Sequence, residues 1–283
     1  MAAAAPGDLI LDVREESEFL QGHLLGAYNV PWAEMASRGF ELPARSRPFL
    51  VCCGEDSFEE VRDWFATRAK AWQATVVPAT RTLLDSAPEV GPSPPGRFLF
   101  SPSPLLQEAM SRLEEIQISC APKEPRALDV GCGSGREALA LATAGWEVTA
   151  LDRDRRGLDR LCRLAERQGC RDRCRVLRCT LEAEGDLVAS LGLKEPCETF
   201  QLVMVNRHLH RPTLREMTEL LGPGGLLLFH TFMEGCVHPS DPAHVLKPGE
   251  LRRIFEGLQV ERDEELPGED GRPMSFFIAR KPA

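Results

Sequence analysis

The C-terminal two thirds of the chain alternates short apolar runs with stretches of helical periodicity. The apolar run at residues 127–130 predicts a buried strand, and the run at 147–152 predicts a second strand that ends in an acid. The periodicity of residues 136–144 between them predicts a helix. Similar apolar runs predict further strands at 175–179, 200–205 and 226–229. Strands that alternate with helices in this way are typical of a parallel sheet in an α/β domain.

The first 85 residues carry a shorter α/β pattern of their own. Residues 8–14 predict a strand that ends in a charged turn, residues 15–21 predict a short helix, and a second strand is expected within 22–32. The densest Pro, Gly and Ser run of the chain follows at 86–96. Neither a helix nor a sheet continues through such a run, because Pro removes a donor and Gly adds chain entropy.

These changes of pattern predict two domains joined by a Pro-rich linker. We place the N-terminal domain at residues 1–88, the linker at 89–104 and the C-terminal domain at 105–283. A length of 283 residues agrees with about two domains. The net charge of -9 disfavours non-specific nucleic-acid binding, which needs positive charge. Most of this acidity lies in residues 1–90, which carry 8 basic and 14 acidic side chains.

Composition and targeting signals favour a reduced, intracellular setting. No apolar run is long enough to predict a membrane-spanning helix, and the start of the sequence has no secretory pattern. We therefore expect no membrane partner and a cytoplasmic location, with a nuclear one open. The ten cysteines form no C-x-x-C pair, so reduced thiols and no metal site are expected.

A glycine-rich loop follows the predicted strand at 127–130 and carries the strongest chemical signal. Glycines at 131, 133 and 135 allow a tight turn and let a ligand approach the backbone at the start of the next helix. The second strand ends at Asp152, whose carboxylate can accept hydrogen bonds from both hydroxyls of a ribose. A dinucleotide-binding loop would place a glycine at position 136, where this sequence has Arg136.

The sequence from Asp129 to Gly135 closely resembles motif I of class I S-adenosylmethionine (SAM)-dependent methyltransferases, and Asp152 matches their second motif. The resemblance implies a Rossmann-like sheet of seven strands, closed by an antiparallel hairpin at 258–265 and 274–280. It also implies a SAM-dependent enzyme. The residues implied to bind the cofactor are Asp129, Gly131, Cys132, Gly133, Gly135, Arg136, Asp152, Arg153, Thr180 and Leu181.

Candidate acceptor-side residues follow the fourth predicted strand, since ligands of open α/β sheets lie beyond the carboxyl ends of strands. Asn206, His208 and His210 are the candidates for catalysis, with a histidine as general base. Alignment of the acceptor with the activated methyl group can also supply much of the rate of methyl transfer without a dedicated base. The structural alternative for these three residues is a loop that starts a helix and has no catalytic role. The segments at 207–212, 230–232 and 246–251 resemble the TehB-like branch of methyltransferases, which implies a small-molecule acceptor.

An Arg-rich stretch at 153–178 supports RNA as an alternative acceptor. Arg156, Arg160 and Arg163 recur at helical spacing, with leucines available for the opposite face. The structural alternative is a solvated helix face, partly neutralised by nearby acids. A further alternative is a protein that binds SAM without catalysing methyl transfer. The sequence implies no particular oligomeric state.

Residues 6–85 resemble the rhodanese homology domain, through motifs such as Asp12-Val-Arg14 and Gly22-His23. A working rhodanese has a nucleophilic cysteine in a loop after a central strand. Cys52 and Cys53 lie near that place, with Cys53 as the candidate nucleophile, but two acids follow and the loop is short. We therefore expect an inactive or regulatory domain, with sulfur transfer as the alternative.

Overall fold

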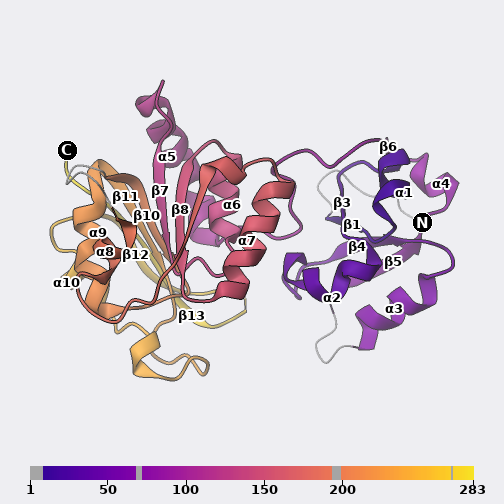
Figure 1. Ribbon diagram of the computed structural model, residues 1–283. Coiled ribbons are helices and arrows are strands. Elements are labelled where there is room, and N and C mark those ends of the chain that lie inside the picture. The colour runs from indigo at the N-terminus through magenta and orange to yellow at the C-terminus, as the bar shows by residue number, and fades with distance from the viewer. Residues whose placement is uncertain (1–8, 68–71, 193–198, 269) are drawn as a thin grey trace. The chain divides into compact units, whose positions relative to one another are not determined.

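The computed structural model describes residues 9–67, 72–192, 199–268 and 270–283 (Figure 1). Residues 1–8 of the predicted N-terminal domain and the cysteine at position 197 lie outside the described residues. The chain divides into two compact units, Met1–Ser101 and Pro102–Ala283. The first unit extends to Ser101 and Leu99 lies in its core, so most of the predicted linker at 89–104 belongs to that unit.

The N-terminal unit is built on a parallel sheet of four strands in the order β3-β1-β4-β5. Its members are β1 (Ile10–Asp12), β3 (Ala27–Asn29), β4 (Phe49–Cys53) and β5 (Ala74–Pro78). A separate antiparallel pair joins β2 (His23–Leu24) to β6 (Pro88–Glu89). The helices and 3₁₀ turns are α1 (Glu16–Gln21), η1 (Trp32–Glu34), α2 (Met35–Arg38), η2 (Gly39–Glu41), α3 (Phe58–Thr67) and α4 (Arg81–Leu84).

The four-stranded sheet separates two apolar clusters, because successive side chains of a strand point to opposite faces. Leu11 of β1 and Val51 of β4 belong to the larger cluster, whereas Ile10 and Cys52 belong to the smaller one. At the end of β1, the Arg14 guanidinium donates to both carboxylate oxygens of Asp12. Both faces of this small sheet are therefore covered.

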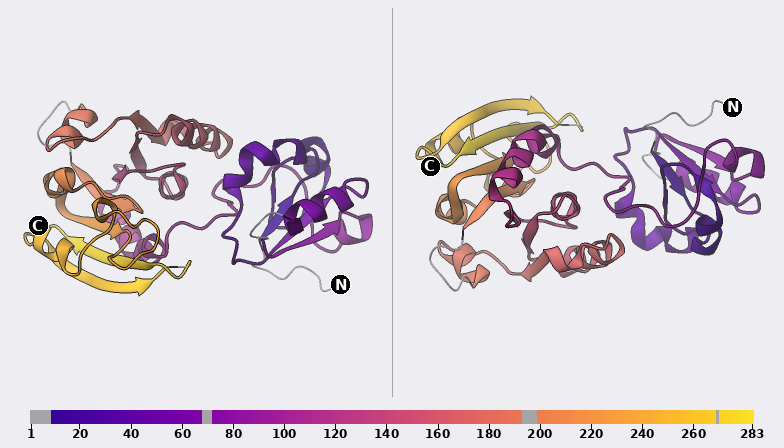
Figure 2. Two further views of the ribbon diagram at one scale, coloured as in Figure 1. Left: turned by 90° about the horizontal axis from the view of Figure 1, so that it is seen from below. Right: turned by 90° about the horizontal axis from the view of Figure 1, so that it is seen from above.

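The C-terminal unit contains a sheet of seven strands in the order β12-β13-β11-β10-β7-β8-β9. Five strands are parallel: β7 (Arg126–Val130), β8 (Glu147–Asp152), β9 (Cys174–Arg178), β10 (Phe200–Asn206) and β11 (Leu221–His230). The antiparallel hairpin of β12 (Gln259–Pro267) and β13 (Pro273–Arg280) completes one edge and is yellow in Figure 2. The predicted fold class is confirmed by this sheet and by the smaller α/β unit.

Helices cover both faces of the seven-stranded sheet. In Figure 1, α6 and α7 lie on one side, and α8, α9 and α10 lie on the other. The helices and 3₁₀ turns are α5 (Pro104–Cys120), α6 (Arg136–Thr143), α7 (Arg155–Arg167), η3 (Arg171–Arg173), α8 (Asp186–Leu191), η4 (Arg211–Thr213), α9 (Leu214–Leu220), η5 (Pro242–His244) and α10 (Glu250–Ile254). Among the described residues, we find no helix with the length and apolar character needed to cross a membrane.

Candidate active site

A cavity of about 450 Å³ lies at the carboxyl ends of β7, β8 and β10. The strand order reverses at β7, which has β8 on one side and β10 on the other, and ligands of open α/β sheets bind at such a point. The structure brings twelve of the predicted site residues to its wall: Asp129, Gly131, Cys132, Gly133, Arg136, Asp152, Arg153, Thr180, Leu181, Asn206, His208 and His210.

The glycine loop has backbone angles that other residues rarely adopt. Gly131, Gly133 and Gly135 have φ angles of 76°, 56° and 76°. A Cβ on Gly133 would meet no atom within 4 Å, so this part of the backbone is open to a ligand. A Cβ on Gly135 would lie 2.4 Å from Leu161 of α7, which explains why Gly135 packs a helix and does not line the cavity.

Asp152 ends β8 and holds the glycine loop in place. One carboxylate oxygen accepts from the Gly133 N–H at 2.8 Å, and the other accepts from the Asp154 N–H at 2.8 Å. The side chain is half-buried and lines the cavity. Asp152 can therefore bind a ribose and fix the loop at the same time.

Two further carboxyl groups lie deep in the cavity wall. Asp129 is 1% exposed and Glu137 is 6% exposed. Burial and the neighbouring acids Glu137 and Asp152 raise the pKa of Asp129 well above its ordinary value. Burial likewise raises the pKa of Glu137. Both groups are costly to ionise here unless a cation is bound close to them.

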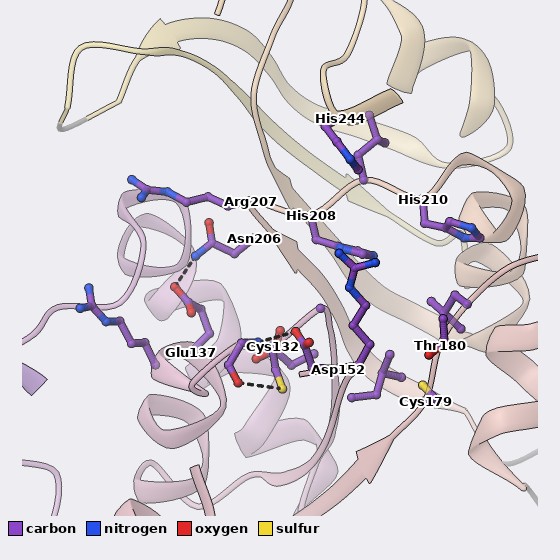
Figure 3. Close-up of a pocket in the computed structure, with 18 residues that line it drawn as sticks. Cys132, Glu137, Asp152, Cys179, Thr180, Asn206, Arg207, His208, His210 and His244 are labelled. Carbon is purple, nitrogen blue, oxygen red and sulfur yellow. Dashed lines mark hydrogen bonds between the residues drawn. The ribbon is translucent and has the colours of Figure 1, made fainter. Parts of the chain in front are cut away.

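The histidines enter the cavity from two separate segments (Figure 3). His208 packs over the glycine loop, because a Cβ on Gly131 would lie 2.4 Å from the His208 Cγ. Its Nε2 is buried without a hydrogen-bond partner, and burial lowers the pKa of its imidazole. His210 Nδ1 lies 3.2 Å from the Thr213 hydroxyl, and His244 approaches from the connection between β11 and α10.

The remaining predicted residues complete the cavity around its other end. Thr180 and Leu181 follow β9, and the Leu181 side chain packs against the main apolar cluster. Cys132 also lines the cavity, but burial raises the pKa of its thiol, so it remains protonated. Arg153 lines the cavity with its side chain largely exposed. The roles assigned to these residues stay predictions.

Three residues at this site were not predicted from the sequence. Glu137 gave only the signal of an acid in the first turn of a helix, and His244 lies in a segment without periodicity. Gly157 of α7 is also buried, and a Cβ on it would lie 2.5 Å from the Gly133 carbonyl oxygen. A glycine inside a predicted helix was the available signal for that close approach.

The two cysteines of the N-terminal unit lie within strand β4 and not in a loop. Cys52 is 1% exposed and Cys53 is 0% exposed, and they point into different apolar clusters. Burial and the carboxylate of Asp12 raise the pKa of Cys52 to about 12 and that of Cys53 to about 11. A buried thiol that stays protonated is a poor nucleophile, so this geometry disfavours sulfur transfer.

We expect Cys52 and Cys53 to resist alkylation in the folded protein. Iodoacetamide reacts with thiolates, and both thiols are buried and protonated at neutral pH. Mass spectrometry after brief treatment should find neither position modified, whereas all ten cysteines should react in urea. Rapid modification of Cys53 in the native protein, together with thiosulfate turnover, would contradict this prediction.

No group of three or more His, Cys, Asp or Glu side chains is placed to hold a metal ion within the described part of the chain. The nine described cysteines are free thiols.

Comparison with known proteins identifies both units. Residues 127–225 match the family model of the methyltransferase domain, and residues 2–77 match that of the rhodanese-like domain. An uncharacterized protein of Schizosaccharomyces pombe, UNK4.09, is 28% identical over 326 residues, which cover 96% of this chain and 93% of that protein. The alignment with that relative therefore extends over both units of this chain.

Other similar proteins match only the C-terminal unit or part of it. A tRNA 5-carboxymethoxyuridine methyltransferase of Escherichia coli is 27% identical over 115 residues, which cover 41% of this chain and 43% of that enzyme. The crystal structure of TehB from Haemophilus influenzae has 17% identity and a TM-score of 0.47, with 62% of this chain and 61% of that chain covered. The chain thus spans less than two thirds of these two proteins. The matched models therefore show a methyltransferase domain in the C-terminal unit and, ahead of it in the chain, a rhodanese-like domain in the N-terminal unit.

Proposed function

We propose that this protein transfers the methyl group of SAM to a small molecule held in the cavity of the C-terminal unit. The observation that carries the proposal is the wall formed by the 206–210 segment and His244 beyond the glycine loop. A cavity of about 450 Å³ lies within the size range of small-molecule sites. We also propose that the N-terminal unit has a regulatory or docking role in a cytoplasmic protein.

Arg211 holds the segment that brings His244 to the cavity. Its guanidinium donates to both carboxylate oxygens of Glu250, at 2.6 and 3.0 Å. It also donates to the backbone carbonyls of Pro242, Ala243 and Val245. The planar guanidinium has five N–H donors, so it can bind a carboxylate and several carbonyls at once. Arg211 in η4 therefore fixes the segment that lines the methyl-acceptor side of the cavity.

The residues present fit SAM, which supplies an activated methyl group when bound. Asp152 lies where a ribose hydroxyl pair can donate to it, and Gly133 leaves room for close approach to the backbone. Asp129 has a buried carboxylate oxygen without a partner, as a site for an ammonium group requires. These residues would hold the donor and align it with the acceptor.

His208 is the best placed general base. Its lowered pKa keeps the imidazole neutral at physiological pH, and its Nε2 has no hydrogen-bond partner. A neutral imidazole nitrogen can accept a proton from a hydroxyl, thiol or amine acceptor as the new bond forms. Arg207 and Arg211 are instead paired with Asp270 and Glu250, which weakens the expectation that they orient an anionic acceptor.

Replacing Arg211 by methionine is expected to loosen the 236–249 segment without loss of SAM binding. The change removes the ion pair with Glu250 and the bonds to three carbonyls. Limited proteolysis should cut this segment at least about tenfold faster, because local opening controls cleavage. The matched control is Arg252→Met, which removes an exposed pair with Asp263 and should leave cleavage unchanged.

The acceptor class can be tested with methyl-labelled SAM and a cell extract. The purified protein should place label in the small-molecule fraction, and the Asp152→Ala variant should place none there. Label in the protein fraction or in the RNA fraction would contradict the proposed acceptor.

RNA is the second candidate acceptor, favoured by the exposed arginines of α7. Arg155, Arg156 and Arg163 are exposed, while Leu158 and Leu161 are buried on the opposite face. The similar Escherichia coli enzyme acts on tRNA by name. If RNA is bound along this face, Arg156→Glu with Arg163→Glu should abolish RNA binding.

A further inference from the structure

Two oxygen acceptors without partners lie at the same end of the cavity. They are Oδ2 of Asp129 and Oδ1 of Asn206, and both atoms are buried. Asp129 is paired in register with Met204 across β7 and β10. Because side chains two residues apart share a face of a strand, Asn206 lies on the same face as Asp129 and one step nearer the carboxyl end. Both residues line the cavity.

Glu137 determines which way the Asn206 amide points (Figure 3). Its Oε1 accepts from the Ser103 N–H at 3.0 Å and from Asn206 Nδ2 at 2.7 Å. That oxygen already accepts from the Ser103 N–H, which can only donate, so it faces Asn206 as an acceptor and takes the amide nitrogen as its second donor. The amide oxygen is thereby left on the side away from Glu137.

This end of the cavity suits a ligand that carries both positive charge and several N–H donors. Asp129 and Glu137 are buried carboxyl groups that lie close enough for Glu137 to affect Asp129 electrostatically. A buried polar acceptor without a partner costs free energy until a donor reaches it. An ammonium group supplies three donors and one positive charge, which match two acceptors and the nearby acid.

The geometry points to Asn206 as a ligand of the α-amino group of SAM, oriented by Glu137 and acting together with Asp129. Asn206 is thus a cofactor-binding residue, whereas the sequence suggested a role in catalysis. Glu137 is a positioning residue, since it acts through the Asn206 amide. The inference rests on SAM binding within the proposed function and does not depend on the acceptor.

Two ligands that differ at the amino-acid end test this assignment. S-adenosylhomocysteine carries the α-amino group, and methylthioadenosine keeps the adenosine but lacks the amino acid. Asn206→Leu is expected to weaken S-adenosylhomocysteine about 10- to 100-fold, the effect of one hydrogen bond to a charged group. Titration calorimetry should find the affinity for methylthioadenosine within about twofold of the wild type, because no contact to it is lost.

A second variant keeps the test decisive if Asn206→Leu does not fold. Glu137→Gln keeps the shape of the side chain but allows the Asn206 amide to turn over, so it should weaken S-adenosylhomocysteine and spare methylthioadenosine. Equal weakening of both ligands would assign a merely structural role and overturn the inference. A lower kcat with unchanged S-adenosylhomocysteine binding would overturn it as well. A wild-type protein that binds neither ligand would instead refute the proposed function itself.

Discussion

Replacing Asp152 by alanine is expected to weaken the binding of SAM and its analogues severely. The change removes an acceptor for both ribose hydroxyls, and each hydrogen bond to a charged group contributes about 1.5–3 kcal/mol. It also frees the Gly133 and Asp154 N–H groups, so the glycine loop loses its fixed position. The dissociation constant of S-adenosylhomocysteine should rise by at least about 100-fold in titration calorimetry.

Methylthioadenosine separates this effect from a loss at the amino-acid end. It contains the ribose, so Asp152→Ala should weaken it as strongly as S-adenosylhomocysteine. The control is Asp159→Ala on α7, which removes only an exposed contact with Arg155. Retained affinity for both ligands in Asp152→Ala would remove Asp152 from the binding site.

The sheet of the C-terminal unit could be predicted because its strands are buried on both faces. Such strands are nearly continuous apolar runs, and β7, β8 and β10 each follow this pattern. The glycine loop and Asp152 could also be predicted from local sequence, because each lies at the carboxyl end of a strand that is itself predictable. Their position at the reversal of strand order was then fixed by the topology.

Contacts between distant segments could not be predicted in this way. His244 reaches the cavity because Arg211 binds Glu250 and three carbonyls, and no periodicity records that clamp. The direction of the Asn206 amide depends on Glu137, whose other donor is the backbone of Ser103. The sequence also could not show whether Cys53 lies in strand β4 or in the loop after it, because the short loop does not mark where the strand ends.

Replacing Gly157 by alanine is expected to damage SAM binding from outside the cavity. Alanine favours a helix interior over glycine by about 1 kcal/mol, so propensity alone predicts a more stable protein. The new Cβ would instead lie 2.5 Å from the Gly133 carbonyl oxygen and 2.9 Å from the Gly133 carbonyl carbon. Backbone atoms cannot rotate away as a flexible side chain can, so the glycine loop must move.

Movement of the loop should lower both stability and affinity. Overpacking of this kind costs about 1–3 kcal/mol, which should lower the melting temperature of the C-terminal unit. A displacement of about 1 Å beside the ligand should raise the dissociation constant of S-adenosylhomocysteine at least tenfold. Thermal melting and titration calorimetry measure the two effects separately.

Gly257→Ala is the matched control, because a Cβ there meets no atom within 4 Å and the glycine has no left-handed φ. It should change stability by no more than about 0.5 kcal/mol and leave ligand affinity unchanged. If Gly157→Ala behaved like this control, α7 could not be packed on the glycine loop as the structure describes. A loss confined to Gly157→Ala would show that the cofactor loop is positioned by the helix behind it as well as by Asp152.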